Sequence, residues 1–225
     1  MFAVVFEVHP RAGKKDAYLA LARHLKPMLE KVDGFIDNER FESKRREGWV
    51  LSLSTWRDEK SLIRWRSQGE HHEIQGQGRS AIFSDYHLRV CEVTADDCPP
   101  PGLNVVQQRF DETEVGPAKA LAITEVSPQG GATFPATDEF LVRLGFDATS
   151  AGLLGHDLFE SIFNPGKLLL LTSWNNAAEA GRWAPRSFDG ISGLRHRRLR
   201  SVRDYGMFER REAPQYFAPA QPPAA

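Results

Sequence analysis

Cysteine, net charge and long apolar runs are all scarce in this chain of 225 residues. Its two cysteines, Cys91 and Cys98, form neither a CxxC motif nor a cluster with histidine, which argues against a disulfide framework and a zinc site. The formal net charge of −1 provides no attraction to nucleic acid or to an anionic membrane. No apolar run approaches the length of a membrane span or follows a basic N-terminal region, so we expect a cytoplasmic location.

The chain also lacks the glycine fingerprint of dinucleotide-binding folds, a P-loop and any cluster of metal ligands. These motifs hold phosphates or metal ions with backbone N–H groups and side chains at fixed spacing. Their absence is consistent with chemistry that needs no cofactor and no metal.

What the chain does contain is a repeat of itself. With a constant offset of 118 residues, the stretch 34–65 aligns with 152–183 without a gap, and ten of the 32 positions are identical. The chain is therefore predicted to hold two copies of one unit of about a hundred residues. Recurring aromatic residues are Trp56 with Trp174, Trp65 with Trp183 and, one residue out of step, Tyr86 with Tyr205.

The first copy has the hydrophobic periodicity of a β-α-β-β-α-β unit. Residues 14–32 carry apolar side chains at helical spacing, and Asp58 is placed to cap a helix over 59–67. This order of elements predicts a ferredoxin-like unit, an antiparallel sheet with helices on one face. The remaining elements expected here are strands over 2–8, 35–43, 49–56 and 85–94, and a short or broken helix over 70–83.

The second copy predicts the same order with weaker helices. Its basic run, Arg195 to Arg200, is interpreted as a helix before the last strand, either a solvated face or a site for an anionic ligand. Residues 104–114 have no counterpart in the first copy. The predicted division is 1–95 for the first unit, 96–103 for a linker, 104–212 for the second unit and 213–225 for a flexible tail.

Four segments of the first copy carry a family resemblance. They are 34–43 (GFIDNERFES), 51–56 (LSLSTW), Trp65 followed by His71 and His72, and 83–90 (FSDYHLRV). Together they resemble the antibiotic biosynthesis monooxygenase family. The resemblance implies an α+β fold in which two ferredoxin-like units pack sheet on sheet as a dimeric α+β barrel. Here one chain carries both halves, so we expect an internal pseudo-dimer, with further homo-oligomerisation left open.

The same resemblance implies a function. Members include oxygenases that need no cofactor and act with dioxygen on phenols or quinols, so we expect a small aromatic hydroxyl compound as substrate. A haem-degrading variant is disfavoured, because its first-strand asparagine would fall near Phe6 or Glu7. The alternative from another class is a non-catalytic or stress-related barrel that binds a small molecule.

In this fold the pocket lies between the sheet and the helices, which directs attention to the region after Trp65. The candidate catalytic residues are His72 as base, with Tyr86 and Arg79 stabilising an anion. The candidate substrate-binding residues are Trp65, His71, Asn38 and Trp56. Each has a structural interpretation too: the histidines as partly exposed helix residues, the tryptophans as core and Tyr86 as an interface residue.

The second copy lacks the candidate base. At the positions of His71 and His72 it has Asp189 and Gly190. Its pocket is therefore predicted to have lost this chemistry.

Overall fold

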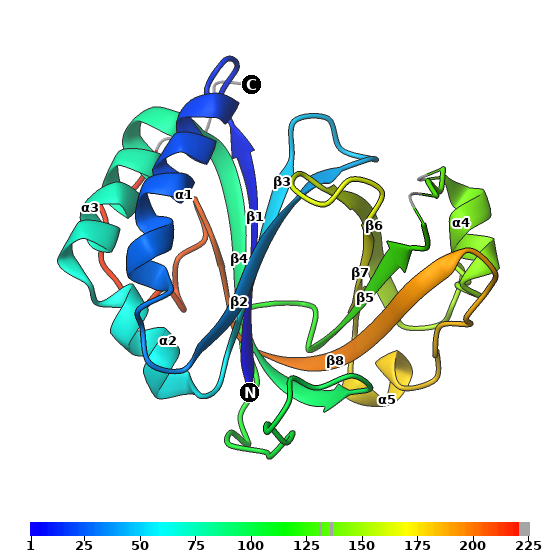
Figure 1. Cartoon of the computed structure of the whole chain (residues 1–225). Coiled ribbons are helices and arrows are strands. Elements are labelled where there is room, and N and C mark those ends of the chain that lie inside the picture. Colours follow the sequence, from blue (N-terminus) through cyan, green and yellow to red (C-terminus); the bar gives the residue numbers. More distant parts are fainter. Residues whose placement is uncertain (131, 136, 221–225) are drawn as a thin grey trace.

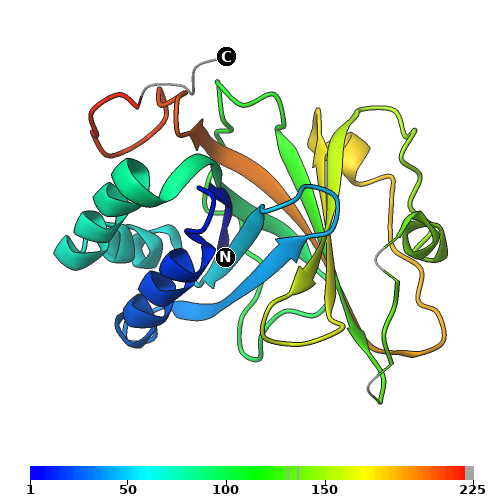
Figure 2. The ribbon, with the colours of Figure 1, turned by 90° about the horizontal axis from the view of Figure 1, so that it is seen from above.

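The computed structural model describes residues 1–130, 132–135 and 137–220, and within them eight antiparallel strands form one closed barrel. The strand order around the barrel is β1-β3-β2-β6-β7-β5-β8-β4. Helices cover the outside of the barrel on two opposite flanks (Figure 1). Seen from above, the larger helical layer belongs to the first unit (Figure 2). Two ferredoxin-like units thus pair within a single chain.

The first unit contains β1 (Phe2–Pro10), α1 (Lys15–Leu29), β2 (Phe35–Ser43), β3 (Val50–Trp56), α2 (Glu59–Arg66), α3 (Gly69–Gln77), a π-helical turn η1 (Gly78–Ile82) and β4 (Phe83–Asp96). The second contains β5 (Ala120–Pro128), α4 (Asp138–Arg143), β6 (Leu153–Ser161), β7 (Leu168–Trp174), α5 (Ala177–Ala180) and β8 (Ile191–Gly206).

Local sequence signals explain where the first unit turns. Asp58 caps α2, since its carboxylate accepts a hydrogen bond from the Ser61 backbone N–H at 2.8 Å. Gly34 has φ +86, and a Cβ there would collide with the Ser61 side chain. Its repeat partner Gly152 has φ +80 and would collide with Glu179. The identity of these two glycines in the repeat therefore has a conformational cause.

The two sheets close on each other through an apolar interior. Phe41 and Phe159, which are repeat partners, are both fully buried in it. Strands β2 and β6 pair so that Glu42 lies opposite Glu160, its own repeat partner. Lys15 and Lys44 neutralise these two glutamates at 2.6 and 2.9 Å. The recurring glutamates thus mark a salt-bridged seam of the barrel.

The basic run corrects one sequence-based expectation. Arg195 to Arg200 lie in the strand β8 and not in a helix. Their partners come from neighbouring strands: Arg195 pairs with Asp96 at 2.7 Å, and Arg197 pairs with Glu125. Long-range pairing, which the run itself does not reveal, makes a strand favourable here. These partners also neutralise Arg195 and Arg197, which removes the argument for an anionic ligand at these two arginines.

Two segments outside the repeat pack onto the barrel. Leu103 and Val105 lie against the barrel interior, and the carbonyl of Ser201 accepts a hydrogen bond from the Thr113 N–H at 2.8 Å. Residues 213–220, which the sequence assigned to a flexible tail, return to the first unit and bond to it through Gln215 and Ala218. Residues 221–225 lie outside the described part. No helix in the described residues is long and apolar enough to cross a membrane.

Burial of Phe159 in the barrel interior predicts how much its truncation destabilises the fold. Phe159→Ala should lower the free energy of unfolding by about 3–5 kcal/mol, because it leaves a cavity where both sheets meet. Phe163→Ala is the control, since that side chain is 54% exposed, and it should change stability by about 0.5 kcal/mol or less. Chemical denaturation measures both. Equal effects of the two substitutions would contradict a shared barrel core.

Candidate functional site

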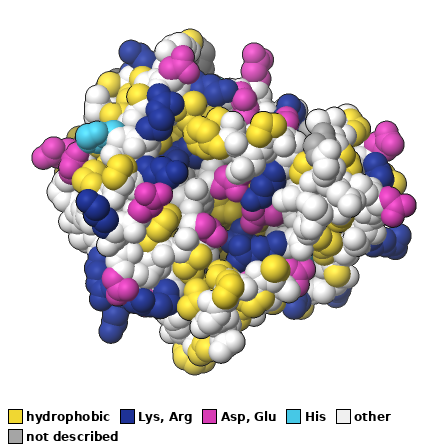
Figure 3. Space-filling model, in the orientation of Figure 1, with side chains coloured by type: hydrophobic (Ala, Val, Ile, Leu, Met, Phe, Trp, Pro, Cys, Tyr) yellow, Lys and Arg dark blue, Asp and Glu magenta, His cyan; other side chains and the backbone are white. Residues whose placement is uncertain are grey.

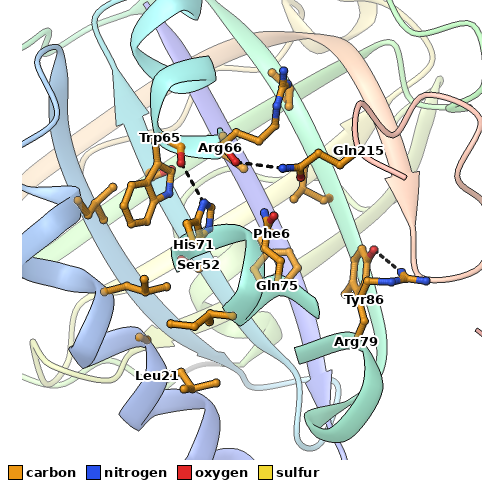
Figure 4. Close-up of a pocket in the computed structure, with 18 of the residues that line it drawn as sticks. Phe6, Leu21, Ser52, Trp65, Arg66, His71, Gln75, Arg79, Tyr86 and Gln215 are labelled. Atoms are coloured by element: carbon orange, nitrogen blue, oxygen red, sulfur yellow. Dashed lines mark hydrogen bonds between the residues drawn. The ribbon is translucent and has the colours of Figure 1, made fainter. Parts of the chain in front are cut away.

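A cavity of about 200 Å³ lies between the sheet and the helices of the first unit. Its walls are mainly apolar and come from β1, β4 and α1, including Phe6, Leu21, Leu25 and Leu88. Its polar lining includes five of the seven residues predicted from the sequence: Asn38, Trp65, His71, Arg79 and Tyr86. Figure 4 shows four of them around the cavity: Trp65 from α2, His71 from α3, Arg79 from η1 and Tyr86 from β4.

His71 is the histidine that faces this cavity. Its ring stacks on Trp65 with 4.2 Å between centroids, and Nδ1 lies 3.1 Å from the Trp65 carbonyl oxygen (Figure 4). Because a carbonyl only accepts, Nδ1 carries the proton and Nε2 keeps its lone pair. Burial lowers the pKa of His71 to about 4, so the ring is neutral at pH 7. The site therefore holds a proton acceptor in a fixed orientation.

Two predicted site residues lie elsewhere. His72 is exposed on the outer side of α3 and stacks on Phe217 at 4.9 Å, because neighbours on a helix point about 100° apart. The expectation that His72 faces the pocket is therefore corrected in favour of His71. Trp56 is fully buried behind the cavity, and its indole donates to the Ser54 hydroxyl at 3.0 Å. Trp174 makes the same bond to Thr172 at 2.8 Å, which explains the recurrence of this tryptophan as a packing role.

Tyr86 and Arg79 meet at the side of the cavity where the C-terminal segment passes. The Tyr86 hydroxyl accepts hydrogen bonds from Arg79 at 2.6 Å and from Arg210. Arg79 also donates to the carbonyls of Met207 and Ala218, at 3.2 and 3.3 Å. These arginines thus tie residues of the second unit and the C-terminal segment to the first unit.

The C-terminal segment itself completes the cavity wall. Pro214, Gln215 and Phe217 line it, and the Gln215 amide donates to the Arg66 carbonyl at 3.0 Å (Figure 4). The interpretation of this proline-rich stretch as a tail missed the contact, because nothing in its local sequence points to a partner 149 residues away.

The cavity lining carries an excess of positive charge. Four arginines line it: Arg40, Arg66, Arg79 and Arg210. No aspartate or glutamate of the described residues lines it, and none lies within 4 Å of these guanidinium groups. The hydrogen-bond partners of Arg40, Arg79 and Arg210 are amide, phenol and backbone oxygens. Acidic and basic groups otherwise alternate over the surface, as the middle of the face in Figure 3 shows.

Sequence analysis missed several lining residues. Tyr18, Arg40 and Gln75 line the cavity together with Arg210 and Phe217. Tyr18 has helical spacing typical of a core residue, and Arg40 lies in a strand with charged neighbours. No motif distinguishes them from ordinary structural residues, because only the packing of α1 and α3 over the sheet brings them together.

The second unit fills the corresponding space with aromatic rings. Phe188 packs against Phe134 at 5.4 Å and Phe140 at 6.0 Å between centroids. Asp189 and Gly190 lie in the turn before β8, so no helix stands where α3 stands in the first unit. Across residues 1–130, 132–135 and 137–220, no three His, Cys, Asp or Glu side chains gather closely enough to hold a metal ion.

Known proteins resemble this chain in sequence and in fold. The sequence model described as antibiotic biosynthesis monooxygenase matches residues 1–77. A protein of Pyricularia oryzae named jasmonate monooxygenase ABM is 40% identical over 225 residues, covering 98% of this chain and 100% of that protein. Two crystal structures of aldoxime dehydratase, one in complex with butyraldoxime, have TM-scores of 0.56. They cover 90% of this chain and 81% and 79% of theirs, at 13% and 12% identity, a likeness of fold alone.

The environment of His71 predicts its titration. Its imidazole should titrate near the pKa of about 4 that burial causes, below the ordinary value of 6.5. The unfolded chain then takes up this proton at higher pH than the folded chain, so His71 should lower stability as the pH falls from 6.5 toward 4. NMR of the imidazole signals measures this, with His71→Gln to assign the signal. Titration near 6.5 would show that the ring is solvated.

Proposed function

This chain belongs to the antibiotic biosynthesis monooxygenase family, and from that premise we propose that it oxygenates a small, mainly apolar molecule that carries a negatively charged oxygen. One observation supports this choice above the others. Four arginines line an apolar cavity to which the described residues contribute no carboxylate. An unpaired positive charge in apolar surroundings is costly, and an anionic ligand would offset that cost.

The first candidate substrate is jasmonate or a molecule of its kind. The relative named for that activity is 40% identical along its whole length, and the name denotes a carboxylate. The second candidate is an aromatic hydroxyl compound, which is anionic as a phenolate. Phe6, Phe83 and Tyr86 form an aromatic wall of the cavity, since Phe6 packs on Phe83 at 5.9 Å and on Tyr86 at 5.6 Å between centroids. An aromatic substrate can pack against these rings, which favours this candidate.

The proposed chemistry begins with proton transfer. His71 Nε2 takes a proton from a CH₂ group that is activated by an adjacent carbonyl, and the net positive charge around the cavity favours the resulting enolate. A base whose pKa is about 4 is weak in the empty cavity. An anionic substrate beside the ring raises that pKa, which brings the base toward the operating pH when it is needed.

Dioxygen then reacts with the carbanion to form a C–O bond. The peroxide takes up the proton held at Nε2, the second C–H proton leaves, and the O–O bond breaks. The balance is CH₂ + O₂ → C=O + H₂O, in which the substrate supplies all the electrons that reduce dioxygen. No other reductant enters this sequence.

The alternative is a barrel that binds the same ligands without turnover. Oxygen uptake with jasmonic acid, hydroquinones and anthrones separates the two, measured with and without ascorbate. The proposal expects uptake and, under ¹⁸O₂, one labelled oxygen atom in the organic product. Tight binding without uptake or label on any of these compounds would favour the binding protein instead.

Substitution of the two adjacent histidines tests the base. His71→Gln should lower kcat by about 10²- to 10⁴-fold, the usual contribution of a positioned base. His72→Gln is the matched control and should retain most activity, since that ring lies outside the cavity. Steady-state kinetics beside a melting curve measures both. A larger loss from His72→Gln would return the role of base to that residue.

A further inference from the structure

Three polar atoms of the cavity lining are buried and have no hydrogen-bond partner among the residues that the structure describes. They are Tyr18 Oη, Arg40 Nε and Gln75 Oε1, from α1, β2 and α3. A buried polar atom left unsatisfied costs about 1–3 kcal/mol, so native proteins rarely keep one without a reason. Three such atoms around one cavity indicate that a bound molecule supplies their partners.

Tyr18 and Arg40 are neighbours. The Arg40 guanidinium lies 5.9 Å from the centroid of the Tyr18 ring. Tyr18 is 6% exposed, and its ring is held edge-on by Phe83 at 5.7 Å between centroids. The Tyr18 hydroxyl and the Arg40 Nε–H are both donors, so both suit an acceptor oxygen on the ligand.

A chain of hydrogen bonds holds Arg40 in place. Its Nη1 donates to Asn38 Oδ1 at 2.9 Å. Asn38 Nδ2 in turn donates to the Leu53 carbonyl at 2.9 Å and to the Ser52 hydroxyl at 3.1 Å. These bonds fix the orientation of the amide and therefore that of the guanidinium. Arg40 is thus oriented by neutral groups, and its charge has no carboxylate partner among the described residues.

The other three arginines are less available. Arg79 and Arg210 already donate to the Tyr86 hydroxyl and to carbonyls of the C-terminal segment. The guanidinium of Arg66 points away from His71 (Figure 4). Arg40 is the one whose Nε is both buried in the cavity wall and unpartnered in the described part of the chain.

We propose that Tyr18 and Arg40 form the subsite that binds the anionic oxygen of the substrate, with Asn38 as the residue that positions Arg40. This assignment rests on the proposed function, since it names where that substrate's charge is held. Gln75 Oε1 accepts from a hydroxyl or N–H group elsewhere on the ligand. Arg79 and Tyr86 then serve to hold the C-terminal segment rather than the substrate.

The test compares a carboxylate with its neutral ester. Calorimetry on the full chain measures the binding of jasmonic acid and benzoate, and of their methyl esters. Wild type should bind the acids more tightly than the esters. Arg40→Met should weaken binding of the acids by about 10- to 100-fold and abolish the preference over the esters, because it removes a charge-assisted bond. Tyr18→Phe should weaken it by about 2- to 10-fold.

Matched controls are Arg23→Met and Tyr216→Phe, both at exposed positions, which should bind as wild type does. Melting curves show whether each variant folds, and Arg40→Lys, which keeps the charge but lacks Nε, should recover only part of the affinity. In the oxygen-uptake assay, Arg40→Met should raise KM more than it lowers kcat.

The outcomes separate the two proposals. Unchanged binding in Arg40→Met, or a loss only in Arg66→Met, would overturn the subsite while turnover by wild type left the proposed function standing. Loss of acid binding in Arg40→Met without any oxygen uptake by wild type would support the subsite and reject oxygenation. Failure of wild type to prefer either acid over its ester would overturn the subsite, whatever the turnover.

Discussion

The structure depends on the burial of one apolar face of each four-stranded sheet against the other. A single sheet covered by helices on one side leaves its second face bare, and such a face is poorly soluble. Here the two faces close into one barrel with a shared interior that includes Phe41, Leu51, Phe159 and Leu169. Because both sheets lie in one chain, the second unit supplies this cover without a separate partner molecule.

Each unit also buries a glutamate that is paired with basic side chains. Burial raises the pKa of Glu7, but the guanidinium groups of Arg89 and Arg46 outweigh it and lower that pKa overall. Burial likewise opposes ionisation of Glu125, which lies 118 residues after Glu7, and Arg197 and Lys167 lower the pKa of Glu125 overall. Arg46 also reaches Asp157 of the second unit at 2.7 Å. The ion pair of Arg46 with the buried Asp157 therefore joins the units in addition to apolar contact.

The two units have similar sheets but differ in the helices that cover them. The first unit keeps three helices and an open cavity, whereas the second fills its space with Phe134, Phe140 and Phe188. The second unit and the C-terminal segment contribute to the cavity in another way, since Arg210 and Phe217 line its wall. The guanidinium groups of Arg79 and Arg210 each lie 5.5 Å from the centroid of the Phe217 ring, which also stacks on His72. One half thus carries the candidate chemistry, and the other helps to enclose it.

The sequence by itself determined the repeat and the order of strands and helices in the first unit. These follow from local features: periodicity, the Asp58 cap, the turn at Gly34, and recurring tryptophans that must be buried. It placed Trp65, His71, Asn38, Arg79 and Tyr86 near one another through the family resemblance, since all come from the segments that carry it or from the helices between them.

Only the tertiary structure decided which side chains face the cavity and which charges are paired. The sequence favoured His72 as the base, whereas His71 is the histidine that lines the cavity, because the packing of α3 against Trp65 decides which ring faces it. It misassigned Arg195 to Arg200, whose acidic partners lie on other strands, and it missed the return of residues 213–220. It also gave no sign of Tyr18 and Arg40 as a pair. The physical reason is common to all: burial and pairing between distant segments decide these positions, and neither is encoded in the local pattern of the chain.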